Sequence, residues 1–384
     1  MKETNVGVKI PLCLVFLIII FLPLANGFFH FVPEEQLQEK REPDQPGVFT
    51  LDSVFQYIKQ YTRYYNDRFF FRAPLIRFYN KIKCQWFNVS GVPKVIIGKD
   101  GWLFQARKNE EPGTPGYFPS VQPFTSRQLE EWGRLVEQRR QWLARRGIDY
   151  LLILVPDKSS VYPEYLPDSL RPFYGRSRLP QLADYLKKNS DVPVLDLGEV
   201  LRASKKERPV YYKTDSHWNE YGAWAAYGEI VTTLSPPFEN VAPLPLSDFR
   251  LRKRKDRPGG NLAVMLSLQE TLFREEALKL IPRRPFRYKE ADPPAVRLSR
   301  SVRTDAFQCD GAALPGAVMF HDSFGRKLKT FLPEHFSRVV FIRDWGFRFH
   351  AEVVEEERPA VVLDEIAEHF LYDAVFDNSP IDNK

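Results

Sequence analysis

The chain has 384 residues, of which 43% are hydrophobic and 14% aromatic, and it contains 31 prolines. This composition is typical of a loop-rich globular protein and excludes a largely disordered chain. The formal net charge of +6 is compatible with an acidic polymer or an anionic membrane surface as a partner, but it requires neither. Six histidines and three cysteines form no cluster with metal-ligand spacing, so the sequence predicts no metal site, and it predicts no cofactor.

Residues 1–29 contain an uncharged apolar run, residues 10–29, whose length of about 20 residues suits the hydrocarbon core of a bilayer. Lysines precede this run and glutamates follow it: Lys2, Lys9, Glu34, Glu35 and Glu39. The positive-inside rule therefore places the leading segment in the cytoplasm and the rest of the chain outside. We favour an N-terminal transmembrane helix that serves as a membrane anchor. A signal peptide cleaved after Gly27 and a buried core helix stay open as alternatives, the former because Ala25 and Gly27 have the A-x-A-like spacing.

Residues 30–92 are expected to connect this segment to the main domain. Residues 30–47 are polar and contain prolines, which indicates a stalk. Residues 49–87 are rich in tyrosine, phenylalanine and arginine, and we expect amphipathic helices that pack against the main domain or lie on the bilayer surface. Cys84 and Cys309 would form one disulfide in an oxidising compartment or remain two free thiols, and the sequence leaves both alternatives open.

Residues 93–384 alternate between apolar runs typical of strands and patterns typical of helices. Strands are expected at residues 95–97, 102–104, 150–155, 192–197, 317–320, 339–342 and 361–363. Helices are expected at residues 125–146, 179–188, 220–234 and 324–332. The first of these helices begins with a capping box of Thr125 and Gln128 and ends at Gly147. This alternation predicts an α/β layered domain with a mostly parallel sheet.

Residues 236–313 interrupt this alternation of strands and helices. They are expected to form an irregular excursion from the core, with one short helix at residues 262–272. They contain many prolines and a run of arginine and lysine at residues 250–257. This basic run is interpreted as a solvated loop or, alternatively, as a surface that binds a polyanion or lies against a membrane. Nucleic acid is not an expected partner, because the chain is predicted to be exported.

Two short segments, residues 215–219 and 321–325, contain the side chains of an activated serine nucleophile. Asp215 and His217 lie two residues apart, so their side chains share one side of an extended segment. Ser323 lies between a buried strand and a helix, where backbone N–H groups would stabilise an oxyanion. His217 is the expected base and Asp215 the group that orients it. Two alternatives remain: Ser323 as a helix cap, and His321 as the base.

The chain resembles the alginate O-acetyltransferase family of the AlgJ/AlgX type, which has an SGNH-hydrolase-like fold. The resemblance covers roughly residues 93–371 and depends on motifs that occur in order: residues 98–104, 156–158 with 162–167, 212–219, 322–325, and 358–362 ahead of Glu365 and Glu368. It implies a catalytic triad of Asp215, His217 and Ser323. The chain departs from the family pattern at His321, where glycine is common, and at Asn261, where aspartate is common.

The resemblance implies a two-step reaction in which Ser323 accepts an acetyl group and passes it to a hydroxyl of an extracytoplasmic polysaccharide. It also implies a multi-pass membrane O-acyltransferase as the acetyl supplier, and a location at the inner membrane with the catalytic domain in the periplasm. Two alternatives stay open. One is a carbohydrate acetyl esterase with the same triad, and the other is a non-catalytic scaffold for polysaccharide export.

Overall fold

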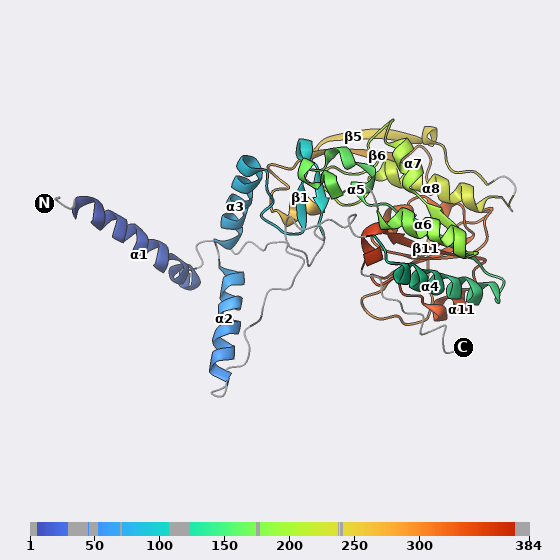
Figure 1. The fold of residues 1–384 in the computed structure, drawn as a ribbon, viewed down its shortest axis with the longest axis horizontal. Helices are drawn as coiled ribbons and strands as arrows, with labels where there is room; N and C mark the ends of the chain where they lie inside the picture. Colours follow the sequence, from blue (N-terminus) through green and yellow to red (C-terminus); the bar gives the residue numbers. More distant parts are fainter. Residues whose placement is uncertain are drawn as a thin grey trace. The chain divides into compact units, whose positions relative to one another are not determined.

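The structure is a computed structural model that describes residues 6–29, 45, 53–69, 71–106, 123–173, 177–236, 238 and 241–372. The chain divides into two compact units (Figure 1). One unit comprises Met1–Val92 and Ala263–Leu272, and the other comprises Pro93–Leu262 and Phe273–Lys384. Each unit is described by itself below.

The first unit contains three helices, α1 (Val6–Phe29), α2 (Val54–Arg68) and α3 (Arg72–Phe87). Within the part of the chain that the structure describes, no helix combines the length and the hydropathy needed to cross a bilayer. The buried Asn80 on α3 donates a hydrogen bond to the carbonyl of Leu266 (2.8 Å), which attaches the segment Ala263–Leu272 to this unit. The expected stalk at residues 30–47 lies outside the described residues, except for Gln45.

The second unit is built on a seven-stranded sheet with the order β4-β3-β11-β9-β10-β8-β7. Its strands are β3 (Asp149–Val155), β4 (Val194–Asp196), β7 (Lys289–Ala291), β8 (Arg303–Gln308), β9 (Ala317–His321), β10 (Arg338–Arg343) and β11 (Val361–Ala367). Strands β4, β3, β11, β9 and β10 run parallel to one another, whereas β8 is antiparallel to both of its neighbours, β10 and β7. The predicted α/β domain with a mostly parallel sheet is therefore confirmed.

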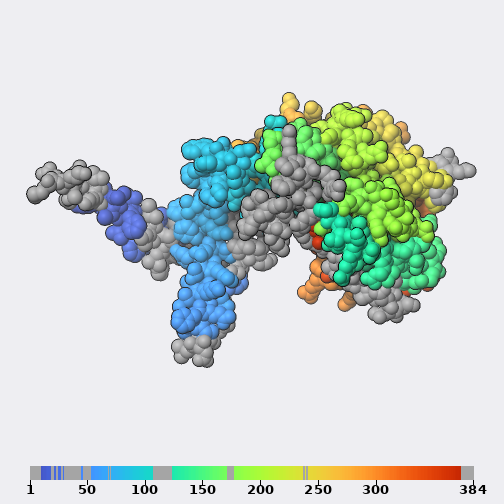
Figure 2. Space-filling model, in the orientation of Figure 1, coloured from blue at the N-terminus to red at the C-terminus, as the bar shows by residue number. Residues whose placement is uncertain are grey.

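Helices cover both faces of this sheet because the central strands are apolar on both sides. On β3, Leu152 and Leu154 pack in the cluster that includes α4 (Ser126–Ala144), α6 (Arg178–Asn189) and α11 (Ala351–Glu357). Leu151 and Ile153 face the other cluster, which includes α7 (Gly198–Ser204), α8 (Glu220–Leu234) and α10 (Gly325–Leu328). Each such side chain contributes roughly 1.5–3 kcal/mol when fully buried. In the space-filling view, helices such as α4 and α6 hide most of the sheet (Figure 2).

Local sequence signals account for several of the observed boundaries. Helix α4 begins after a reciprocal capping box of Thr125 and Gln128, and the chain leaves it through Gly147 with a φ of 69°. Strands β1 (Val95–Ile97) and β2 (Leu103–Gln105) form a hairpin. Its turn places Asp100 and Gly101 at positive φ, as an Asp-Gly turn requires. Helix α8 spans the predicted residues 220–234.

The structure of residues 236–313 differs from the expected irregular excursion. The basic run forms strand β5 (Phe249–Arg257), which pairs with β6 (Glu275–Pro282) in an antiparallel ribbon. Buried Phe249 and Leu280 attach one end of this ribbon to the core, while the charged side chains of residues 250–256 remain exposed. The sequence did not predict a strand here because charged residues are uncommon in strands, and pairing with β6 overrides that preference.

Two expected helices are shorter in the structure. The helix expected at 262–272 is α9 (Asn261–Met265), and it stops before Ser267, whose φ of 58° is incompatible with a continuing helix. The helix expected at 324–332 is α10 (Gly325–Leu328). A third short helix, α5 (Lys158–Val161), follows β3. Cys84 and Cys309 are buried free thiols, so the structure contains no disulfide between them.

Candidate active site

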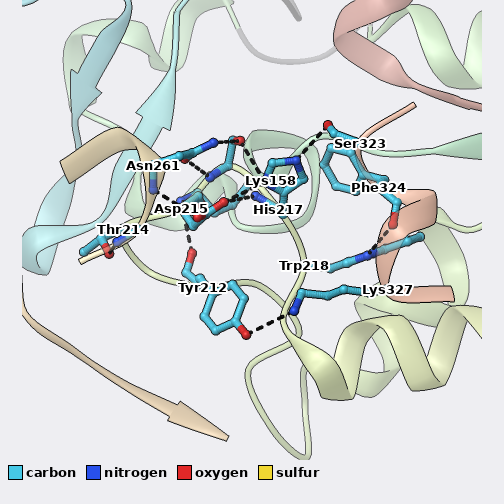
Figure 3. Close-up of polar contacts among 12 residues, drawn as sticks. Lys158, Tyr212, Thr214, Asp215, His217, Trp218, Asn261, Ser323, Phe324 and Lys327 are labelled. Atoms are coloured by element: carbon cyan, nitrogen blue, oxygen red, sulfur yellow. Dashed lines mark hydrogen bonds and ion pairs between the residues drawn. The ribbon is translucent and has the colours of Figure 1, made fainter. Parts of the chain in front are cut away.

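The three predicted site residues meet at the carboxyl end of the parallel sheet (Figure 3). His217 Nε2 lies 2.8 Å from Ser323 Oγ, and His217 Nδ1 lies 2.7 Å from Asp215 Oδ1. Ser323 is partly exposed, as are the side chains of His217 (24%) and Asp215 (17%). The arrangement is therefore a hydrogen-bonded carboxylate, imidazole and hydroxyl that solvent and small molecules can reach.

Ser323 is held in place by the turn that follows β9. Asp322 Oδ1 accepts a hydrogen bond from the Phe324 N–H (2.7 Å), and Asp322 Oδ2 accepts one from the Ala367 N–H at the end of β11 (2.8 Å). Asp322 therefore caps this turn, and the Ser323 hydroxyl bonds to His217 instead. Helix α10 has only four residues, so its dipole contributes little at Ser323.

His217 belongs to a short loop closed by a bridge between Tyr211 and Trp218. Directly after it, Asn219 caps α8 through a hydrogen bond from the Gly222 N–H to its Oδ1 (2.9 Å). The buried Trp218 donates from its indole N–H to the carbonyl of Phe324 (3.2 Å). These contacts connect the loop that carries His217 to the turn that carries Ser323.

Asp215 is fixed by a second loop, which contains Gly260 and Asn261. Contact between this loop and Asp215 was not predicted from the sequence. Asp215 Oδ2 accepts a hydrogen bond from the Asn261 N–H (2.9 Å), and the Asn261 side chain bonds to the backbone N–H and the hydroxyl of Ser216. Burial alone would raise the pKa of Asp215. The hydrogen bond and charge of His217, together with the N–H groups of Asn261 and His217, hold that pKa well below its usual range.

The second loop can approach Asp215 only because residue 260 has no side chain. A Cβ at Gly260 would lie 2.3 Å from Asp215 Cβ and 2.6 Å from Asp215 Oδ2. We expect Gly260→Ala to displace the carboxylate and lower kcat/KM for an acetyl ester about 100-fold, because small misplacements in an active site are costly. The matched control is Gly316→Ala, whose new Cβ would meet only one atom, at 3.8 Å. Equal activity of both variants would contradict this role of Gly260.

Lys158 is a further residue of the site. It lies in the motif at residues 156–158, but its role was not predicted from the sequence. Its side chain is buried, and Nζ donates to the carbonyls of Tyr212 (3.1 Å), Lys213 (3.0 Å) and Asp215 (2.6 Å). Burial lowers the pKa of Lys158 to about 7. The Lys158 side chain thus binds three backbone carbonyls of the loop that carries Asp215 and His217.

His321, the alternative base, is not placed to act on Ser323. It is buried, its Nδ1 bonds to the carbonyl of Asp322 (2.5 Å), and burial lowers its pKa to about 3. Its ring packs so closely on Gly325 that a Cβ there would lie 2.5 Å from a ring carbon. The imidazole at this position therefore supports the turn around Ser323, and His217 is the imidazole that contacts the Ser323 hydroxyl.

Acidic side chains are concentrated beneath the turn. Glu365 Oε2 accepts a hydrogen bond from the Asp322 N–H (3.1 Å), and burial raises the pKa of both Asp322 and Glu365. Burial also raises the pKa of Glu368 to about 8. Glu368 accepts hydrogen bonds from the Asp157 N–H and from the Ser160 hydroxyl. One basic group, His369, lies among these acids, with its Nδ1 2.6 Å from Asp157 Oδ1.

Comparisons with known proteins identify the family of the chain. A family model described as "SGNH hydrolase-like domain, acetyltransferase AlgX" matches residues 95–298, a range that includes Asp215 and His217 and ends before Ser323. The probable alginate O-acetylase AlgJ of Pseudomonas aeruginosa is 31% identical over 242 residues, which cover 61% of this chain and 53% of that protein. The protein of the same name from Azotobacter vinelandii is 27% identical over 210 residues, 55% of this chain and 47% of its own. The chain thus spans about half the length of the curated relatives it matches.

Solved structures support the fold. PatB1 of Bacillus cereus, solved with a sulfonyl adduct, aligns with a TM-score of 0.54 at 15% identity and covers 72% of this chain and 97% of its own. A DHHW family protein from Eubacterium siraeum aligns with a TM-score of 0.54 at 14% identity, covering 76% of this chain and 96% of its own. Because the family model matches more than half of the 384 residues, this chain belongs to the family of SGNH hydrolase-like acetyltransferases of the AlgX type.

Proposed function

We propose that this protein is an O-acetyltransferase that carries an acetyl group on Ser323 and delivers it to a hydroxyl of an extracytoplasmic polysaccharide. The observation that carries this proposal is the unbroken chain of hydrogen bonds from Asp215 through His217 to Ser323, with contacts of 2.7 and 2.8 Å. The names of the curated relatives support acetyl transfer as the reaction and a polysaccharide of the alginate kind as the acceptor.

In the first half-reaction, His217 Nε2 takes the proton of Ser323 as Oγ attacks the acetyl carbonyl of the donor. The Oγ–carbon bond forms, the carbonyl electron pair moves onto oxygen, and the leaving group departs with the proton that His217 returns. Asp215 stabilises the imidazolium that forms in between. In the second half-reaction the same imidazole removes the proton from a sugar hydroxyl, which attacks the acetyl-serine and releases Ser323.

The N-terminal segment is proposed to tether this chemistry to the inner membrane, with the catalytic unit in the periplasm. The apolar run at residues 10–29 and the two lysines ahead of it support this arrangement. A multi-pass membrane O-acyltransferase would supply the acetyl group beside the anchor. Full-length chain in the membrane fraction is the expected result of cell fractionation. A chain shortened at Gly27 in the soluble fraction would instead indicate a cleaved signal peptide.

In a transferase a sugar hydroxyl attacks the acetyl-serine, whereas in an esterase water attacks it. We expect purified protein given a soluble acetyl ester to acetylate an added oligosaccharide, and the oligosaccharide to accelerate release of the leaving group. Mass spectrometry of the oligosaccharide measures the transfer. Release of acetate at a rate that the oligosaccharide does not change, with no acetylated sugar, would contradict the transferase and support the esterase.

A further inference from the structure

His369 occupies a position beside the nucleophile that the triad chemistry does not explain. In the sheet order, β11 lies between β3 and β9, and Val155 of β3 pairs with Ala367 of β11. Phe320 of β9 pairs with Asp364 of β11, so Ser323, three residues later, lies alongside Ala367. His369, two residues after Ala367, is bonded to Asp157 in the segment after β3, and its ring lies near that of Phe324 in the turn that holds Ser323.

Contacts with two residues locate the His369 ring. Nδ1 faces Asp157, which follows β3, at 2.6 Å from its carboxylate. Because Nδ1 is engaged with the Asp157 carboxylate, Nε2 is the ring nitrogen that remains available to a ligand. The ring also lies 6.0 Å from that of Phe324, the residue directly after Ser323.

Nε2 of His369 is an uncommitted polar atom. No hydrogen bond joins it to another residue that the structure describes, although the side chain is only 14% exposed. The nearby polar side chains have partners already: the ammonium of Lys158 binds three carbonyls, and the Asn261 amide binds Ser216. The short helix α10 supplies little dipole. An N–H at Nε2 would be a further donor for the charge that develops on the acetyl oxygen.

We propose that His369, oriented by Asp157, is a catalytic residue whose Nε2–H donates a hydrogen bond to the carbonyl oxygen of the acetyl group as the tetrahedral intermediate forms. The proton stays on Nε2 throughout, while His217 alone accepts and returns the proton of Ser323. Donors aimed at a developing oxyanion typically contribute about 10²–10³-fold to kcat. This inference rests on the proposed function, because it requires an acetyl-serine at Ser323.

The charges around His369 favour the donor form of the ring. Burial alone would lower the pKa of His369, but the carboxylates of Asp157, Asp322 and Glu368 raise it above its ordinary value. Asp157 follows β3, Asp322 follows β9, and Glu368 precedes His369 in its own segment. When the ring loses a proton, the remaining one stays on Nδ1 beside the Asp157 carboxylate, so Nε2 can no longer donate. Loss of the imidazolium should therefore appear as a fall in kcat at alkaline pH.

The test uses the full chain and an acetyl ester of p-nitrophenol. We expect His369→Phe to lower kcat about 100-fold with little change in KM, and His369→Gln, which keeps an N–H donor, to lose less. We also expect wild-type kcat to fall at alkaline pH, and this fall to be absent in His369→Gln because an amide does not titrate. The matched control is His350→Gln, which removes an imidazole paired with Asp344 at 3.0 Å and should leave kcat unchanged.

The possible results distinguish failure of the role proposed for His369 from failure of the proposed acetyltransferase function. If ester turnover depends on Ser323 but His369→Phe keeps wild-type kcat, or if His369→Gln keeps the alkaline fall, His369 is not the donor and the proposed function stands. If turnover does not depend on Ser323, both claims fail. Should His369→Phe not fold, the pH profile of His369→Gln decides the question.

Discussion

Replacing Ser323 with alanine is expected to lower kcat for acetyl transfer by about 10⁴-fold or more, because the change removes the oxygen that would hold the acetyl group. The variant should fold normally. It removes one partly exposed oxygen, whose hydrogen bond to His217 contributes roughly 0.5–1.5 kcal/mol to the free energy of unfolding. Initial rates with an acetyl ester, alongside thermal unfolding, measure both effects.

The control for this variant is a neighbouring hydroxyl in the same site. Ser216 Oγ lies 3.4 Å from His217 Nδ1 and accepts from the Asn261 amide, so it faces the side of the imidazole away from Ser323. We expect Ser216→Ala to lower kcat by less than about tenfold. If Ser323→Ala still supported normal acetylation in cells, the protein would act as a non-catalytic scaffold for polysaccharide export.

Replacing Asp215 with asparagine should have the next largest effect, a loss of about 10³–10⁴-fold in kcat. The amide would donate to His217 Nδ1, which forces the proton onto Nε2 and leaves no lone pair to accept the proton of Ser323. Shape is nearly preserved, so KM should change little, whereas the free energy of unfolding should fall by about 1–3 kcal/mol because the His217 N–H loses its acceptor. An exposed aspartate on α6, Asp184, provides the control: Asp184→Asn should retain full activity.

The low pKa of Asp215 adds a constraint on the pH dependence. Because His217 and two backbone N–H groups hold that pKa well below its usual range, the carboxylate stays ionised at every pH at which the protein is folded and active. The activity of the wild-type protein should therefore show no step from Asp215 titration above about pH 4, the usual range of an aspartate. A step that disappears in Asp215→Asn would contradict the hydrogen bonding described for this carboxylate.

The main domain was largely predictable because its signals are local. The apolar run of β3, the capping box at Thr125 and the Asp-Gly turn each determine a short stretch of backbone without distant partners. Strand β5 was not predictable in this way. Its charged side chains give no apolar pattern, and its conformation depends on pairing with β6, about 25 residues away.

The candidate site was likewise predictable only in part. Asp215, His217 and Ser323 were identified because each carries reactive chemistry within a recognisable motif. Lys158 and Asn261 were missed as supporting residues, because their roles depend on contacts with atoms more than 40 positions away in the chain. No local pattern in a single sequence marks such contacts. The family resemblance already favoured His217 over His321, and the fold adds the contact between His217 Nε2 and Ser323 Oγ across 106 positions in the chain.

The covalent intermediate is the most direct test of the account. Full-length protein would be mixed with an acetyl donor, quenched in acid within a turnover, digested and examined by mass spectrometry. The account predicts one added acetyl group on the peptide that contains Ser323, absent from the Ser323→Ala variant and removed when an oligosaccharide acceptor is supplied before the quench. An acetyl group on another residue, or turnover with no acetyl group on Ser323 at any quench time, would contradict it.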